Sequence, residues 1–276
     1  MKKKLYETDK GNICYWTNEI THNRPALVLL PGLTADHRLF DKQTEYFEHK
    51  YDLLVWDAPG HAESRPFELN ITLDDKAAFL YEILKKENIA KPILIGQSMG
   101  GYVAQCFIDL FPQTASGFIS IDSAPLQRKY VTAAEIWLLK RMEPVYRLYP
   151  WKTLLKSGSN GCAETEYGRK LMWDMMNVYS GAKRDYCHIA GTGYKMLAKA
   201  MEADRPYKID CPALLICGER DKAGSTKRYN RKWSQTDGLP IVWIEGAGHN
   251  SNTDAPDEVN RLIENFIVEH ALAKQL

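Results

Sequence analysis

A serine flanked by two glycines offers the clearest chemistry in this sequence. Gly96, Ser98 and Gly100 form a G-x-S-x-G pattern in KPILIGQSMGGYVAQCFIDLF, after an apolar stretch and before a helical one. This pattern is typical of a nucleophile elbow, a sharp strand-to-helix turn whose strained backbone exposes the serine hydroxyl. A glycine-rich turn with an incidental serine is the alternative interpretation. The strand before the motif and the helix after it favour Ser98 as a nucleophile.

A serine hydroxyl needs a base, and the pKa of histidine suits that role near neutral pH. We favour His249, which follows the last apolar run in IVWIEGAGHNSN, where Gly246 and Gly248 would let the loop reach over the strand ends. A lone loop histidine is usually a surface residue, but the chain order Ser, Asp, His favours catalysis. The other histidines lie in positions less suited to this role: His22, His37, His49, His61, His188 and His270.

The histidine needs a carboxylate that fixes its tautomer and stabilises its charged form. Asp221 follows the apolar run in ALLICGERD and is the predicted acid. Asp122, in ISIDSAPL, follows an earlier strand at the same end of the predicted sheet and is the alternative. Glu219 is also close in sequence, and any of the three could be a simple turn residue.

Two backbone N–H groups should stabilise the charge that develops on an attacked carbonyl oxygen. Met99 follows the nucleophile at the start of a helix and supplies the first. Leu33, in LVLLPGLTADHRLF, is expected to supply the second, because Gly32 permits close approach of the backbone.

Short apolar runs alternate with helical patterns and must position these residues. Unbroken runs of this length are typical of strands buried on both faces of a parallel sheet. The last helix should begin at Pro256 and present Val259, Ile263 and Phe266 on one face. Right-handed crossovers then predict an α/β fold with a doubly wound, mostly parallel sheet. The runs cover residues 26–30, 53–56, 93–95, 118–121, 213–217 and 241–244.

The alternation stops over residues 126–206, which contain helical patterns and no convincing strand. We interpret this segment as an all-helical lid inserted into a core made of residues 1–125 and 207–276, with KSGSNG at 156–161 as a loop. The lid should lie over the carboxyl ends of the strands, where ligands bind. Its tryptophans and methionines supply apolar surface, although most must simply pack.

Composition sets further bounds on the chain. It has 276 residues, 45% of them hydrophobic and 26% charged, as expected for a packed globular protein. A net charge of +1 favours neither nucleic acid nor an anionic membrane. The basic start MKKKLYETDKGN lacks the apolar region of a signal peptide, and no membrane span is expected. Six scattered cysteines without a CxxC pair suggest reduced thiols in the cytoplasm and no metal site.

Together these motifs resemble the α/β-hydrolase fold superfamily over the whole length apart from the lid. VWDAPGHAES also resembles the superfamily's D-x-x-G-x-G-x-S turn, with Asp57, Gly60 and Ser64 in place and Ala62 at the second glycine. CGERD and GAGH match its acid and base motifs. Where relatives commonly have His-Gly before the oxyanion donor, this chain has Pro31 and Gly32.

The resemblance implies a cofactor-free, carboxylesterase-like serine hydrolase that acts through an acyl-enzyme. Its expected partner is a small molecule, with an apolar or aromatic acyl group. The same three residues could also serve C–C bond hydrolysis, aminopeptidase, acyltransferase or perhydrolase chemistry. A small-molecule receptor on the hydrolase fold is the alternative from another class, and the oligomeric state stays open.

Overall fold

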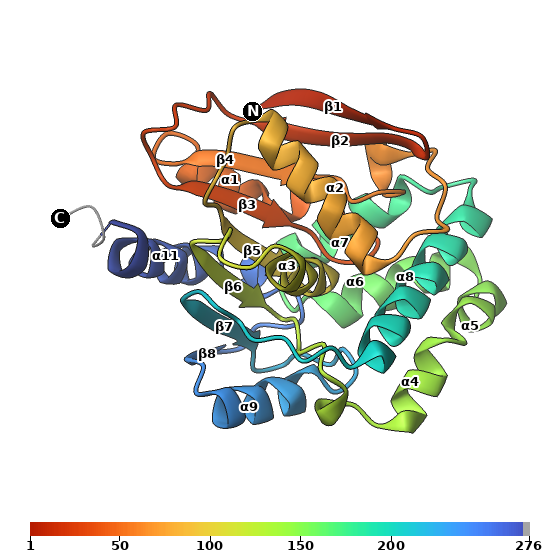
Figure 1. The fold of residues 1–276 in the computed structure, drawn as a ribbon. Helices are drawn as coiled ribbons and strands as arrows, with labels where there is room; N and C mark the ends of the chain where they lie inside the picture. Colours follow the sequence, from red (N-terminus) through yellow and green to blue (C-terminus); the bar gives the residue numbers. More distant parts are fainter. Residues whose placement is uncertain (273–276) are drawn as a thin grey trace.

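Within residues 1–272, which the computed structural model describes, eight strands form one sheet in the order β1-β2-β4-β3-β5-β6-β7-β8 (Figure 1). The strands are β1 (Lys2–Thr8), β2 (Gly11–Thr17), β3 (Ala26–Leu30), β4 (Asp52–Trp56), β5 (Ile93–Gln97), β6 (Gly117–Ile121), β7 (Ala213–Gly218) and β8 (Ile241–Ile244). The six from β3 to β8 coincide with the six apolar runs.

The strands from β3 to β8 pair in parallel, whereas β1 and β2 add an antiparallel hairpin at one edge. In register, Val28 of β3 lies between Leu54 of β4 and Leu94 of β5. The hairpin was not predicted from the sequence. Its first strand, KKKLYET, alternates exposed and half-buried residues at the sheet edge and has no apolar run.

Helices cover both faces of the sheet, which confirms the predicted doubly wound α/β architecture (Figure 1). Helices α2 (Leu73–Lys86), α3 (Met99–Leu110) and α9 (Thr226–Asp237) pack on one face, and α1 (Asp41–Phe47) and α11 (Pro256–Ile267) pack on the other. The short elements are η1 (His37–Phe40), η2 (Ala62–Ser64), η3 (Arg128–Tyr130), α10 (Ser251–Asp254) and the π-helical η4 (Val268–Leu272).

Local sequence signals begin two of these helices. The hydroxyl of Thr72 accepts a hydrogen bond from the Asp75 N–H, and the Asp75 carboxylate accepts one from the Thr72 N–H, which starts α2. Pro256 begins α11, and its stripe of apolar residues is buried against the sheet. One residue departs from the pattern, because Lys76 lies buried on the inner face of α2.

Five helices lie between β6 and β7, and in Figure 1 they gather at one side of the sheet. They are α4 (Ala133–Leu139), α5 (Met142–Leu148), α6 (Trp151–Cys162), α7 (Glu166–Asn177) and α8 (Lys183–Ala203). We call residues 133–203 the helical segment.

The expected loop at 156–161 was wrong, because these residues are part of α6. Gly158 faces α7, where an added Cβ would lie 2.6 Å from the Met176 sulfur. The small residues therefore allow two helices to pack closely instead of breaking one. None of the helices in residues 1–272 is both long enough and apolar enough to cross a bilayer.

Candidate active site

Ser98 lies at the tip of a strained turn between β5 and α3. Its φ of 49° and ψ of −115° fall in a region that residues with side chains rarely adopt. Close packing explains the two glycines of the motif. A Cβ on Gly100 would lie 1.8 Å from the Leu30 carbonyl oxygen, and one on Gly96 would lie 2.4 Å from the Gly101 nitrogen. The elbow can therefore form only with minimal side chains at these positions.

The structure brings the three predicted catalytic side chains together at the carboxyl ends of β5, β7 and β8. His249 Nε2 lies 2.9 Å from Ser98 Oγ, and His249 Nδ1 lies 3.0 Å from Asp221 Oδ2. The other Asp221 oxygen accepts a hydrogen bond from the Ala223 N–H at 2.7 Å. The imidazole thus has one nitrogen on a carboxylate and the other on a hydroxyl.

His249 is 8% exposed and Asp221 is 3% exposed, so the contact between them is shielded from water. Burial alone would lower the pKa of His249, but the adjacent Asp221 carboxylate outweighs it and raises this pKa above its usual range. The site therefore favours an imidazole that accepts a proton readily.

Asp122, the alternative acid, does not hydrogen-bond to His249. Its Oδ1 accepts from the Gly218 N–H at 2.7 Å, and its Oδ2 accepts from the N–H and hydroxyl of Ser251 at 2.8 and 2.6 Å. Burial, together with the nearby Asp221 carboxylate, raises the pKa of Asp122 to about 7. Asp122 therefore joins the end of β7 to the loop after His249. Glu219, the third carboxylate considered, is exposed.

The two predicted oxyanion donors lie on either side of Ser98. Met99 is the first residue of α3, so its N–H has no acceptor within the helix. Leu33 follows Gly32, where an added Cβ would lie 3.1 Å from Ser98 Cβ. The loop after β3 therefore passes directly beside the serine.

Gln97 is a candidate positioning residue that sequence reasoning missed. Its Nε2 donates to the His249 carbonyl at 2.7 Å and to Asn250 Oδ1 at 3.2 Å. Its Oε1 would lie 2.3 Å from a Cβ on Gly32. One side chain thus touches the loops of both the predicted base and the predicted oxyanion donor. Its place before the serine was visible in the sequence, but its contacts were not.

The DAPGHAES turn is held by the hydrogen bonds of Asp57. Asp57 Oδ1 accepts from the N–H and Nδ1 of His37 at 2.8 and 2.9 Å, and Oδ2 accepts from the Glu63 N–H at 2.9 Å. The Ser64 hydroxyl donates to the Asp57 carbonyl at 2.8 Å. These motif residues therefore shape the turn after β4.

Two clusters in the described residues contain side chains that often bind metals: Asp36, His37 and Asp57, and Asp122, Cys217 and Asp221. Their carboxylates already accept hydrogen bonds from the protein. Asp36, for example, accepts from the backbone and guanidinium of Arg38. We therefore assign the first cluster to loop structure, and in the second Asp221 bonds to His249 while Asp122 bonds to Gly218 and Ser251.

The helical segment is tied to the loop that carries His249. Asp254 accepts from the Gly248 N–H at 2.8 Å and from the Glu164 and Thr165 N–H groups at 2.9 Å. The carbonyl of Cys162 accepts from the Asn250 N–H at 2.7 Å. The junction between α6 and α7 therefore lies against this loop.

Helix α8 approaches the other side of the site. A Cβ on Gly193 would lie 2.4 Å from a methyl group of Leu33. Next to it, the hydroxyl of Tyr194 lies 3.4 Å from that of Tyr146 on α5, and burial raises the pKa of both phenols. Two neutral phenols, one on α8 itself and one on α5, therefore lie beside the glycine that contacts Leu33.

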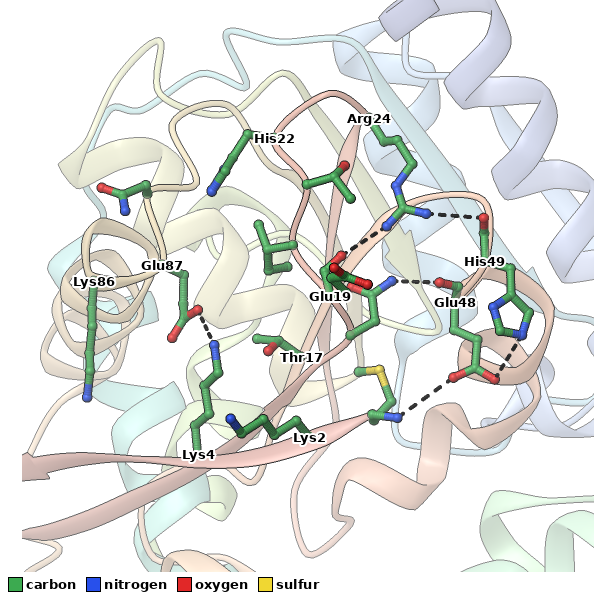
Figure 2. A pocket seen from close by; sticks show the side chains of 15 residues that line it. Lys2, Lys4, Thr17, Glu19, His22, Arg24, Glu48, His49, Lys86 and Glu87 are labelled. Carbon is green, nitrogen blue, oxygen red and sulfur yellow. Dashed lines mark hydrogen bonds and ion pairs between the residues drawn. The ribbon is translucent and has the colours of Figure 1, made fainter.

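A cavity of about 830 Å³ lies far from these residues, at the amino ends of the parallel strands. Its lining comes from β1, from the segments before β3 and β4, and from the end of α2. Figure 2 shows Lys4 directed at Glu87 and Arg24 bonded to the loop that contains His49. Because Ser98 is at the opposite end of the sheet, this cavity is not part of the candidate active site.

Comparison with curated proteins shows relatives that span nearly the whole chain. It is 25% identical to 3-oxoadipate enol-lactonase 1 of Acinetobacter baylyi, covering 89% of both chains. It is 23% identical to (E)-2-((N-methylformamido)methylene)succinate hydrolase of the same organism, covering 91% of this chain and 97% of the relative.

Solved structures share the fold. The enol-lactonase of Burkholderia xenovorans LB400 matches with a TM-score of 0.76 at 20% identity, covering 96% of this chain and all of that one (100%). An esterase of Thermogutta terrifontis matches with a TM-score of 0.80 at 17% identity, covering 98% and 100%. The model of the alpha/beta hydrolase family matches residues 27–262. The chain, with its mostly parallel sheet and flanking helices, belongs to the alpha/beta hydrolase family.

Proposed function

We propose that the protein is a serine hydrolase that cleaves a small-molecule carboxylic ester or lactone through an acyl-enzyme. The observation that carries this proposal is a pair of hydrogen bonds: His249 Nδ1 donates to the Asp221 carboxylate at 3.0 Å, and the Ser98 hydroxyl donates to His249 Nε2 at 2.9 Å. This arrangement suits nucleophilic acyl transfer, because each group activates or orients the next.

In the first step Ser98 Oγ attacks the ester carbonyl while His249 Nε2 takes its proton. The Asp221 carboxylate stabilises the imidazolium that forms. The N–H groups of Leu33 and Met99 donate hydrogen bonds to the oxyanion. As the tetrahedral intermediate collapses, the C–O bond to the leaving alcohol breaks and His249 returns the proton to that oxygen.

In the second step water attacks the acyl-enzyme. His249 accepts the proton of the water, a second oxyanion forms in the same place, and the bond to Ser98 Oγ breaks. The carboxylic acid leaves and the serine recovers its proton. No cofactor is needed for either step.

We infer that residues 126–206 form a lid over a core of residues 1–125 and 207–276. The contacts of Asp254 and Leu33 with α7 and α8 support this division, since both neighbour the proposed catalytic loops. A relative named as an enol-lactonase supports an ester-type bond in a small molecule. The apolar and aromatic side chains of the lid support an acyl group with apolar character.

A panel of p-nitrophenyl esters of increasing acyl length tests this function. Ser98→Ala should lose at least about 10³-fold in kcat, because the nucleophile is gone while the fold stays intact. A fluorophosphonate probe should label the unaltered protein at Ser98 and leave the variant unlabelled. Equal turnover of esters by both proteins would refute the assignment, and binding without turnover would favour a receptor.

A further inference from the structure

Two basic side chains are buried together at the end of the sheet where Ser98 lies, and the proposed mechanism uses neither. Lys76 and His61 are each 2% exposed. Burial and the positive charge of nearby Lys76 lower the pKa of His61 to about 3, whereas burial lowers the pKa of Lys76 only to about 8. At neutral pH the pair therefore consists of a neutral imidazole and an ammonium group.

Within residues 1–272, no acid pairs with this ammonium group, and no hydrogen bond joins it to the protein. The acids nearest in sequence are engaged elsewhere, because Asp74 pairs with Arg205 at 2.8 Å and Asp75 caps α2. His61 donates from Nδ1 to the Pro59 carbonyl at 3.2 Å, which leaves Nε2 as a buried acceptor without a partner. A buried polar group without a partner is unfavourable unless water or a ligand completes it, and a charge in such a place favours an anionic ligand.

The topology places these groups at the catalytic end of the sheet. His61 lies in the turn that follows the carboxyl end of β4. Helix α2 starts at this end and runs back to the amino ends, where its last residues line the cavity of Figure 2. Lys76 is the fourth residue of α2 and lies on its buried side. Helix α2 packs against α3, which begins beside Ser98. Helix α8 of the helical segment also contacts α2.

We infer that Lys76 and His61 form a subsite for a carboxylate-bearing ligand, with the ammonium group pairing with the carboxylate and His61 Nε2 accepting a hydrogen bond from a hydroxyl or water beside it. The ligand that fits best is an acyl substrate with a second, remote carboxylate. This substrate class rests on the proposed function, whereas the anion site itself does not. The nearby guanidinium of Arg65, which stacks over Tyr179 at 4.1 Å, adds positive potential.

Two p-nitrophenyl esters of equal acyl length test the subsite, one with a terminal carboxylate and one with a methyl group in its place. The unaltered protein should have the higher kcat/KM for the anionic ester. Lys76→Met should lower the ratio of the two kcat/KM values about tenfold or more, because an ionic hydrogen bond is lost. Lys85→Met removes an exposed lysine from the same helix and should leave the ratio unchanged.

Calorimetric titration of Ser98→Ala with succinate and glutarate, at constant ionic strength, tests the site without turnover. Binding should be lost when Lys76→Met is added. If the diacid inhibits hydrolysis of the neutral ester by the unaltered protein, the site is assigned to a substrate carboxylate. Binding that requires Lys76 without such inhibition would assign it to a separate free acid.

An unchanged ester ratio together with unchanged diacid binding in Lys76→Met would overturn the inference. Because Lys76→Met removes no ion pair, the thermal midpoint of this variant should not fall. If the midpoint does fall, Lys76→Gln provides a second uncharged variant. If the unaltered protein hydrolyses no ester at all, the proposed function fails, while the calorimetric titration still decides the anion site.

Discussion

The side-chain amide of Gln97 donates a hydrogen bond from Nε2 to the backbone carbonyl of His249, 2.7 Å away. Gln97 also precedes Ser98, so a single residue links the backbone of the proposed nucleophile to that of the proposed base. The link is 1% exposed and is supported by Asn250, which accepts a second hydrogen bond from the same nitrogen. The distance between the imidazole and the hydroxyl therefore depends on an amide that performs no chemistry itself.

Replacing this amide should slow the reaction without weakening substrate binding. In Gln97→Leu we expect kcat to fall about tenfold, since roughly 1 kcal/mol of hydrogen bonding is lost and the base loop can shift, while KM changes little. Gln43→Leu is a matched control, because Gln43 is equally buried and bonds to Asn252 and Asn260 rather than to His249 itself. It should lower the thermal midpoint but leave kcat nearly unchanged. Equal effects of the two substitutions on kcat would contradict a positioning role.

The pH dependence of kcat/KM should report the raised pKa of His249. The base must be neutral to accept a proton, so activity should rise with pH through an acid limb whose midpoint lies above the ordinary value of about 6.5. Because the Asp221 carboxylate is what raises this pKa, Asp221→Asn should move the midpoint to lower pH and reduce kcat by about 10⁴. A midpoint that stays fixed in Asp221→Asn would mean that another group titrates.

We expect Asp221 to have a catalytic role and Asp122 a structural one, although both carboxylates are buried. Asp122→Asn should destabilise the fold by about 1–3 kcal/mol, because one of its oxygens becomes an NH₂ group facing N–H donors. Its loss of kcat should be far smaller than that of Asp221→Asn. Chemical denaturation and ester turnover, measured on both variants, check this. A larger loss of kcat in Asp122→Asn would reverse the two roles.

Glycine substitutions should show how tightly the elbow is packed. Gly100→Ala should destabilise the protein by about 3 kcal/mol or more, since its Cβ would lie 1.8 Å from the Leu30 carbonyl oxygen. Gly161→Ala provides the contrast, because Gly161 is in helix α6 and its Cβ would meet nothing within 4 Å. There alanine should stabilise the protein by about 0.5–1 kcal/mol. Urea unfolding of the two variants should shift in opposite directions.

The sequence predicted the elements that carry strong local patterns. Each central strand is an unbroken apolar run, and the serine turn is fixed by glycines at set positions, so both could be read directly. The β1–β2 hairpin could not, because an edge strand needs no apolar run and KKKLYET is stabilised by pairing with β2. The helix at 156–161 was missed because local propensity is overridden there by packing against Met176.

In the candidate site too, some residues could be predicted from local motifs and others could not. Ser98, Asp221 and His249 are each attached to a recognisable motif at a strand end, so chain order alone predicted their convergence. The roles proposed for Gln97 and Lys76 depend on side-chain directions that tertiary packing sets. Lysine within a helix usually lies at the surface, and only the arrangement of α2 against α3 shows that Lys76 is buried.

Asp254 couples the position of the helical segment to that of the loop that carries His249. One carboxylate receives hydrogen bonds from Gly248, next to the proposed base, and from Thr165, at the start of α7. A rigid-body movement of the α6–α7 junction would either break these hydrogen bonds or displace the loop that holds the imidazole. Motion of α4 or α5 would leave these hydrogen bonds, and with them the position of the base, intact, because in the described part of the chain neither helix bonds to Asp254.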